Sequence, residues 1–87
     1  MNEADRPAVL GKITEIIRQE LPRATGVIDA ATTAADVPGW DSLAHVRIIL
    51  AVERAFAFRI RTTEMARLDN IGALVEVVIA RGTAWRT

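Results

Sequence analysis

The stretch that decides the fold of this chain occupies residues 37–47 and reads VPGWDSLAHVR. The dipeptide Pro38–Gly39 is typical of a turn, so it interrupts any helix that precedes it. Asp41 is one of the residue types that cap a helix, because its side chain accepts hydrogen bonds from first-turn amides. We therefore predict a helix that begins at Ser42 and runs to about Phe58.

The predicted helix over residues 42–58 is amphipathic. Its expected apolar stripe consists of Val46, Ile49, Leu50 and Phe56. Ala51 and Ala55 would let another helix approach closely, and Phe58 and Ile60 would cover the end of the helix.

The segment before this helix predicts another helix and a long connection. Residues 5–21 begin with Pro7, whose missing amide hydrogen costs nothing in an opening turn, and Pro22 ends the helix. Apolar residues recur along it at the helical period: Val9, Ile13, Ile16, Ile17 and Leu21. A connection as long as residues 22–41 is more often functional than a plain crossover, although it could simply span the bundle. Its expected core anchors are Val27, Ile28 and Val37.

Two helices are predicted after residue 60. A short helix over residues 62–68 would have Thr62 as its cap. A final helix would be capped by Asp69 or Asn70 and ended by Gly82, with a stripe of Ile71, Leu74, Val75, Val78 and Ile79. No alternating run predicts a β-hairpin. The expected fold class is all-α, a four-helix bundle with three longer helices and one short helix.

Length and composition limit the possible functions. The 87 residues predict a single domain over residues 1–87, with a core of about 5–81. The chain lacks cysteine, which excludes disulfides and thiolate metal sites, and its one histidine, His45, has no metal-ligating partners at suitable spacing. No apolar run approaches the length of a membrane span, and the polar N-terminus does not resemble a signal peptide. We therefore expect a cytoplasmic protein that does not insert into membranes.

Charge is balanced overall but unevenly distributed. Eleven basic and eleven acidic residues give a formal net charge of zero. Within residues 42–61, however, Glu53 is the single acid, against Arg47, Arg54, Arg59 and Arg61. Such a patch steers the association of partners. A small DNA-binding domain that uses these arginines is one alternative, but the neutral total charge argues against nucleic acid as a partner.

Ser42 lacks the neighbours that a nucleophilic serine requires. Such a serine needs a positioned base, and His45, three residues along the same helix, offers neither a pocket nor protection from water. A Gly-x-Ser-x-Gly elbow is also absent. By contrast, a helix N-terminus suits a phosphate ester. The sequence therefore predicts a serine that another enzyme modifies, in a protein that is not itself an enzyme.

The segments GWDSLAHV at residues 39–46 and ILAVERAF at residues 49–56 closely resemble the acyl carrier protein family. The resemblance extends over nearly the whole chain. It implies that Ser42 carries a 4′-phosphopantetheine arm, with Asp41 and Leu43 beside it in the motif. The arm would hold acyl intermediates as thioesters and shuttle them between enzymes. A discrete, monomeric carrier is expected.

The resemblance also implies a partner surface. Leu43, Val46, Arg47 and Arg54 would meet partner enzymes, while Ile60 and Met65 would flank the arm. The expected partners are a phosphopantetheinyl transferase and acyl- or aminoacyl-loading ligases, ketosynthases or acyltransferases. Many fatty-acid carriers have an acidic second helix, and the basic one here favours a dedicated secondary-metabolite or specialised lipid pathway.

Several alternatives remain open in the sequence. The arginines could merely solubilise the helix, which would leave room for a housekeeping fatty-acid carrier. An unmodified helical interaction module would keep the same fold. The sequence does not identify the cargo or say whether the core encloses it. Trp40 either packs under the loop or contacts partners, and no role is predicted for Trp85.

Overall fold

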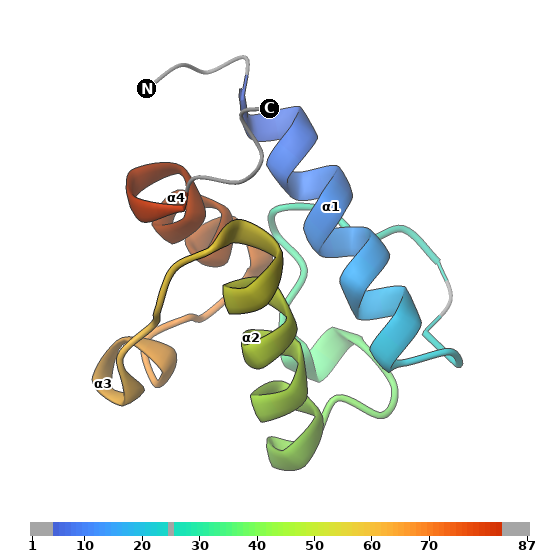
Figure 1. The fold of residues 1–87 in the computed structure, drawn as a ribbon. Helices are drawn as coiled ribbons and strands as arrows, with labels where there is room; N and C mark the ends of the chain where they lie inside the picture. The colour runs from blue at the N-terminus through green and yellow to red at the C-terminus, as the bar shows by residue number, and fades with distance from the viewer. Residues whose placement is uncertain (1–4, 25, 83–87) are drawn as a thin grey trace.

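The computed structural model describes residues 5–24 and 26–82 of the 87-residue chain. Within these residues the helices are α1 (Asp5–Glu20), the 3₁₀ helix η1 (Ala34–Asp36), α2 (Ser42–Phe56), α3 (Thr62–Met65) and α4 (Ile71–Arg81), and there is no strand (Figure 1). The predicted all-α class, with three longer helices and one short one, is confirmed. The 3₁₀ helix was not predicted.

Helix α1 packs against both α2 and α4, while α3 lies to the side of α2 (Figure 1). All five apolar residues of the stripe predicted for the first helix are buried, as are all five predicted for α4. Burying an aliphatic or aromatic side chain of this size contributes roughly 1.5–3 kcal/mol. The packing of α1 against α2 and α4 therefore supplies the core on which the candidate site rests.

The apolar stripe predicted for α2 is only partly correct. Ile49 and Phe56 are buried as expected, but Val46 is 42% exposed and Leu50 is 48% exposed. The other buried members of the helix are Ala44, Ile48 and Val52. Apolar residues occur on two adjacent sides of α2, so periodicity alone could not tell which side faces α1.

Helix α2 ends at Phe56, two residues earlier than predicted. Ala57 adopts a left-handed conformation with φ 56°, and its amide donates to the carbonyl of Glu53. The Glu53 carboxylate then accepts a 2.6 Å hydrogen bond from the amide of Ile60. Ile60 is buried and Phe58 is partly buried against the core, so both cover the end of the helix as expected.

The long connection caps α4 as well as spanning the bundle. The carbonyls of Ala30 and Thr32 accept hydrogen bonds of 2.8 and 2.9 Å from the amides of Gly72 and Ile71. A Cβ at Gly72 would lie 3.0 Å from the Ala30 oxygen, so glycine permits this close approach. The connection is thereby tied to the start of a helix about 40 residues away in the sequence.

The core anchors predicted for the connection need one correction. Val37 is buried and Ile28 is partly buried, as expected, whereas Val27 is 85% exposed. Val27 follows Gly26, which has a φ of +87°. Neighbouring apolar residues in an irregular segment need not share a face, and sequence alone could not distinguish them.

The predicted caps of the last two helices are partly confirmed. Helix α3 ends at Met65, and its N-cap is Arg61, so the prediction of Thr62 was wrong by one residue. Asn70 caps α4 by accepting a 2.8 Å hydrogen bond from Ala73, and Gly82 ends that helix as expected. Trp85 lies outside the described residues. None of the described helices has the length and hydropathy that crossing a membrane requires.

Candidate functional site

A tight turn delivers the chain to the start of α2. The amide of Trp40 donates a 3.2 Å hydrogen bond to the carbonyl of Val37, across Pro38 and Gly39. Gly39 has a φ of +87°, and proline followed by a glycine with positive φ is the pattern of a type II turn. Because proline presets its own φ and glycine accepts the left-handed one, the sequence itself encodes this turn.

Asp41 and Ser42 begin α2 as the sequence predicts. The Asp41 carboxylate accepts a 2.8 Å hydrogen bond from the amide of Ala44, and its carbonyl accepts one of 2.9 Å from the amide of His45. Ser42, the first helical residue, is exposed. In the described part of the chain, no hydrogen bond engages its hydroxyl. The hydroxyl is thus accessible at the positive end of the helix dipole.

An open groove of about 600 Å³ lies beside Ser42. Its polar lining includes Asp41, Ser42 and Thr62. Its apolar lining consists of Ala34, Trp40, Val46, Met65, Ala66 and Leu68. These residues come from η1, the residues just before α2, α2 itself and the segment around α3, so the groove exists only in the folded chain. Sequence reasoning missed Ala34 and Leu68, because neither belongs to a recognisable motif.

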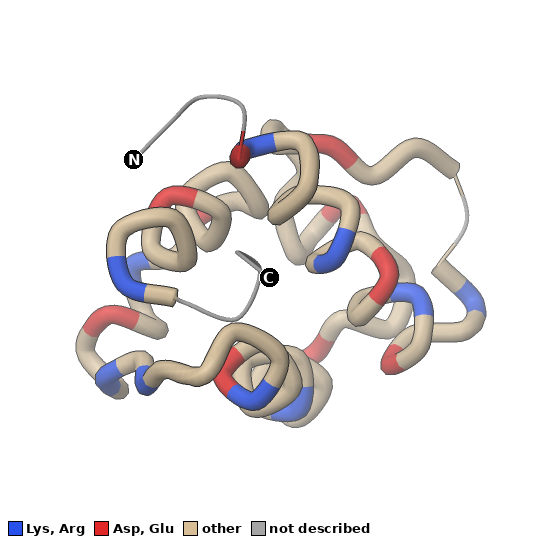
Figure 2. The backbone as a smooth tube through the Cα atoms, turned by 45° about the horizontal axis from the view of Figure 1, so that its top comes forward, with Lys and Arg blue, Asp and Glu red and all other residues tan. Residues whose placement is uncertain are grey.

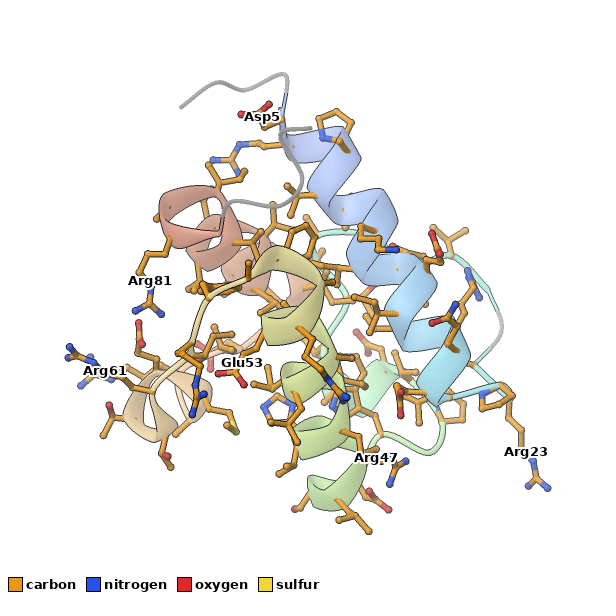
Figure 3. The ribbon with its side chains drawn as sticks, viewed as in Figure 1. Asp5, Arg23, Arg47, Glu53, Arg61 and Arg81 are labelled. Carbon is orange, nitrogen blue, oxygen red and sulfur yellow. The ribbon has the colours of Figure 1, made fainter. Side chains whose placement is uncertain are left out.

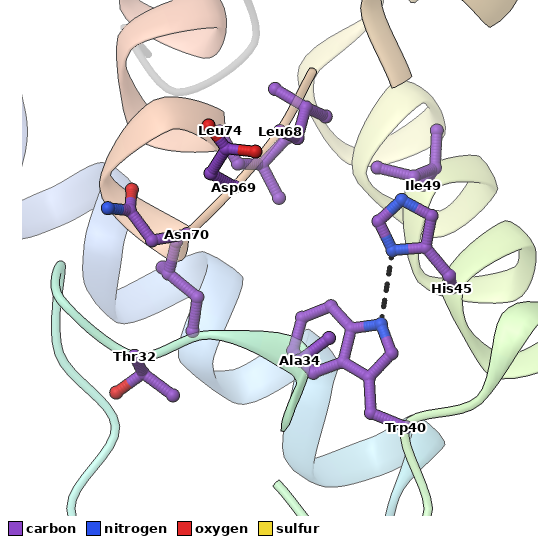
Figure 4. A pocket seen from close by; sticks show the side chains of 10 residues that line it. Thr32, Ala34, Trp40, His45, Ile49, Leu68, Asp69, Asn70 and Leu74 are labelled. Atoms are coloured by element: carbon purple, nitrogen blue, oxygen red, sulfur yellow. Dashed lines mark hydrogen bonds between the residues drawn. The ribbon is translucent and has the colours of Figure 1, made fainter. Parts of the chain in front are cut away.

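Trp40 and His45, which both line this groove, form a hydrogen-bonded pair (Figure 4). The indole Nε1 donates to the imidazole Nδ1 at 3.1 Å, and the two ring centroids are 6.0 Å apart. Trp40 is partly buried against the core, which agrees with the packing alternative. Since an indole N–H can only donate, Nδ1 must be the acceptor, and a neutral His45 then carries its hydrogen on Nε2. His45 in this state has no ring nitrogen left to accept a proton from Ser42.

The exposed side of α2 carries the residues expected to meet partners. Leu43 is 67% exposed and Val46 is 42% exposed. Arg47 lies on α2 (Figure 3), and its Nε is 3.3 Å from a carboxylate oxygen of Glu20 at the end of α1. Arg54 is exposed further along the helix. Exposed apolar residues that form a row with charged neighbours are typical of an interaction surface.

Of the two residues expected to flank the arm, one lies elsewhere. Met65 lines the groove. Ile60 is buried in the core and does not line it, so its expected place on this surface was wrong. The Glu53 carboxylate accepts a 2.6 Å hydrogen bond from the amide of Ile60, and this contact links α2 to the loop that carries the buried Ile60.

The surface around α2 and α3 carries more basic than acidic side chains. Lys and Arg outnumber Asp and Glu along α2 and the segment that follows it (Figure 2). Glu53 binds the amide of Ile60, and Glu64 accepts hydrogen bonds from the Arg61 amide at 3.0 Å and from Arg81 at 2.8 Å. The backbone hydrogen bond from Arg61, followed by the interactions with Arg81, lowers the pKa of Glu64 despite some desolvation. Both carboxylates are therefore occupied within the chain.

Comparisons with known proteins agree with this geometry. A family model described as "Phosphopantetheine attachment site" matches residues 11–78. No curated protein matches the chain. The solution NMR structure of a holo acyl carrier protein from Geobacter metallireducens is similar, with a TM-score of 0.75 and 30% identity over 83% of each chain. The family match over residues 11–78 includes the turn, α2 and every residue that lines the groove. The chain therefore belongs to the acyl carrier protein family, whose members are carriers of a 4′-phosphopantetheine group and not enzymes.

Proposed function

We propose that Ser42 is the attachment site of 4′-phosphopantetheine, and that the protein presents acyl groups on this arm to partner enzymes. The observation that carries the proposal is the exposed Ser42 at the N-terminus of α2, beside a groove with an apolar lining. In a chain of this family, that is a place where a transferase can reach the hydroxyl and where the attached arm can lie against the protein.

The residues around Ser42 suit a phosphate diester. The first-turn amides of α2 give this end of the helix a partial positive charge, which favours a nearby phosphate. The Asp41 carboxylate is held by the amide of Ala44 at 2.8 Å, and the type II turn before it orients the approach to the helix. The prosthetic group supplies a terminal thiol that holds an acyl group as a thioester. The chain itself supplies attachment, orientation and a surface for recognition.

The experiment is intact-mass analysis after incubation with coenzyme A, Mg²⁺ and a broad-specificity phosphopantetheinyl transferase. We expect the wild type to gain the mass of one phosphopantetheine and Ser42→Ala to gain none. Thr63→Ala is the matched control, since it removes another exposed hydroxyl, on α3, and should still be modified. Modification of Ser42→Ala would contradict the assignment. No modification of the folded wild type would favour an unmodified interaction module.

We further propose that the carrier serves a dedicated pathway, with acidic or apolar docking surfaces on its partner ligases, ketosynthases or acyltransferases. The basic surface formed by Arg47, Arg54, Arg59 and Arg61 supports this, because like charges across an interface disfavour binding. The test is malonyl transfer to the modified protein by a fatty-acid-synthesis acyltransferase. We expect slow transfer to the wild type and faster transfer to Arg54→Glu. Rapid transfer to the wild type would instead indicate a housekeeping carrier.

A further inference from the structure

One side-chain hydrogen bond joins two of the described residues that line the groove beside Ser42. It runs from the indole Nε1 of Trp40 to the imidazole Nδ1 of His45, over 3.1 Å (Figure 4). Both side chains are half-buried, so neither ring is fixed by complete burial. The arrangement of the two rings in the groove therefore depends in part on this hydrogen bond.

The chemistry of the two rings makes this hydrogen bond sensitive to protonation. An indole N–H can only donate, and an imidazole nitrogen can accept only while it carries no hydrogen. A protonated imidazole carries a hydrogen on both nitrogens and accepts nothing. Two hydrogens cannot both occupy the 3.1 Å between Nε1 and Nδ1, so a proton on Nδ1 breaks the bond and drives the rings apart. Histidine side chains change charge between about pH 5 and pH 8.

The charged groups around the imidazole can accommodate its protonated form. Asp41, at the start of α2, lines the groove with His45, and Asp69, between α3 and α4, lines a small hollow that His45 also faces (Figure 4). The lining residues that come from η1, α3 and α4 are uncharged, and no Lys or Arg lines either hollow in the described part of the chain. An imidazolium at this position would therefore have carboxylates and no cation as its charged neighbours.

The backbone at both residues is held by hydrogen bonds that do not involve the rings. The amide of Trp40 donates to the carbonyl of Val37 at 3.2 Å, and the amide of His45 donates to the carbonyl of Asp41 at 2.9 Å. Separation of the rings must therefore come from rotation of their side chains. Because both side chains line the groove, such a rotation changes its shape beside Ser42.

We propose that the Trp40–His45 pair is a pH-sensitive contact that sets the shape of the groove. The contact is made while His45 is neutral and is broken when the imidazole gains a proton at mildly acidic pH. The proposal does not depend on attachment of the arm, so it is tested on the unmodified chain and stands or falls separately from the proposed function.

The experiment is an NMR titration of the unmodified, ¹³C- and ¹⁵N-labelled full chain from about pH 8 to about pH 5, the range in which histidine changes charge. His45 is the only histidine, so its ring resonances are unambiguous, and Trp40→Phe identifies the indole resonance of Trp40. At the upper pH we expect a scalar coupling across the hydrogen bond between the indole and imidazole nitrogens. The coupling should disappear, and the indole proton resonance should move, over the pH range in which the imidazole titrates.

The groove should respond together with the pair. We expect the methyl resonances of Val46 and Met65, which line the groove, to move with the same midpoint as the indole resonance. An indole resonance that stays in place while the imidazole titrates would overturn the proposal. So would groove methyl groups that do not follow the indole.

Two variants of His45 test the assignment directly. His45→Asn replaces Nδ1 with an acceptor oxygen that does not titrate, so the indole and groove resonances should no longer depend on pH in this range. His45→Ala removes the acceptor, so its indole resonance should resemble that of the acidic wild type at every pH. Leu50→Ala, which changes an exposed residue of α2 that lines neither hollow, should titrate as the wild type does. If His45→Asn keeps the pH dependence of the wild type, another group is responsible and the proposal fails.

Discussion

At its N-terminal end α2 exposes large apolar side chains, whereas at its C-terminal end comparable side chains are buried. Leu43 is 67% exposed, while Phe56 is 1% exposed. The N-terminal end is held by Asp41, a neighbour in the sequence, and the C-terminal end by Glu53 and the loop through Ile60. A locally encoded end can remain open for modification and partners, because its geometry does not depend on burial. The C-terminal end of α2 buries its apolar side chains and therefore contributes stability that exposed side chains do not provide.

The largest expected difference between the two ends is in core packing. Phe56→Ala should lower the free energy of unfolding by about 3–5 kcal/mol, because it leaves a cavity in the core. Leu43→Ala should change it by less than about 0.5 kcal/mol, because the side chain is mostly in solvent. Urea denaturation of both variants measures the contrast. Equal losses would show that the exposed end also supports the core.

The second expected effect concerns the loop that follows α2. Glu53→Ala leaves the amide of Ile60 without its partner, which should cost about 1–3 kcal/mol of stability. Glu53→Gln keeps an acceptor and should recover most of that loss. Thermal unfolding of the two variants measures it, with the exposed Glu15→Ala on α1 as control. A loss for Glu53→Ala no greater than that for Glu15→Ala would mean that the hydrogen bond does not hold the loop.

The third expected effect concerns the N-cap. Asp41→Ala removes the acceptor for the amide of Ala44 and should cost about 1 kcal/mol, as is usual for loss of an N-cap. Asp41→Asn keeps a capping oxygen and should be nearly as stable as the wild type. Chemical denaturation distinguishes the two variants. If both lose the same amount, the charge of Asp41 matters more than its capping hydrogen bond.

The smallest expected effect is a gain in stability. Ala57 is the one described non-glycine residue with a positive φ, and a left-handed conformation costs such a residue about 1–2 kcal/mol. Ala57→Gly relieves this strain but adds flexibility to the unfolded chain, so we expect a net gain of up to about 1 kcal/mol. Ala80→Gly, at an exposed position within α4, should instead lose about 0.5–1 kcal/mol. A lower Tm for Ala57→Gly than for the wild type would contradict this prediction.

The features that sequence reasoning predicted correctly are those with short-range causes. The Asp41 cap, the turn at Pro38 and Gly39 and the stripe of α1 each depend on residues a few positions apart. The errors concern residues whose burial depends on segments that are distant in the sequence. Periodicity placed Val46 and Leu50 in the core, although both are exposed, and it missed Ile48 and Val52. Ile60 was expected beside the arm because no short-range pattern shows that Glu53 holds its amide.

By itself, the sequence determined the helical class, the start of α2 at Ser42 and the absence of a suitable base for that serine. These follow from local hydrogen bonding, backbone preferences and residue composition, which act within a turn or two. Only the tertiary structure decided which side of α2 is buried, which residues line the groove and that Trp40 and His45 pair beside it. Each of these depends on side chains from separate helices meeting in space. The hydrophobic effect is not directional, so a pattern of apolar residues does not show which helix a given side will face.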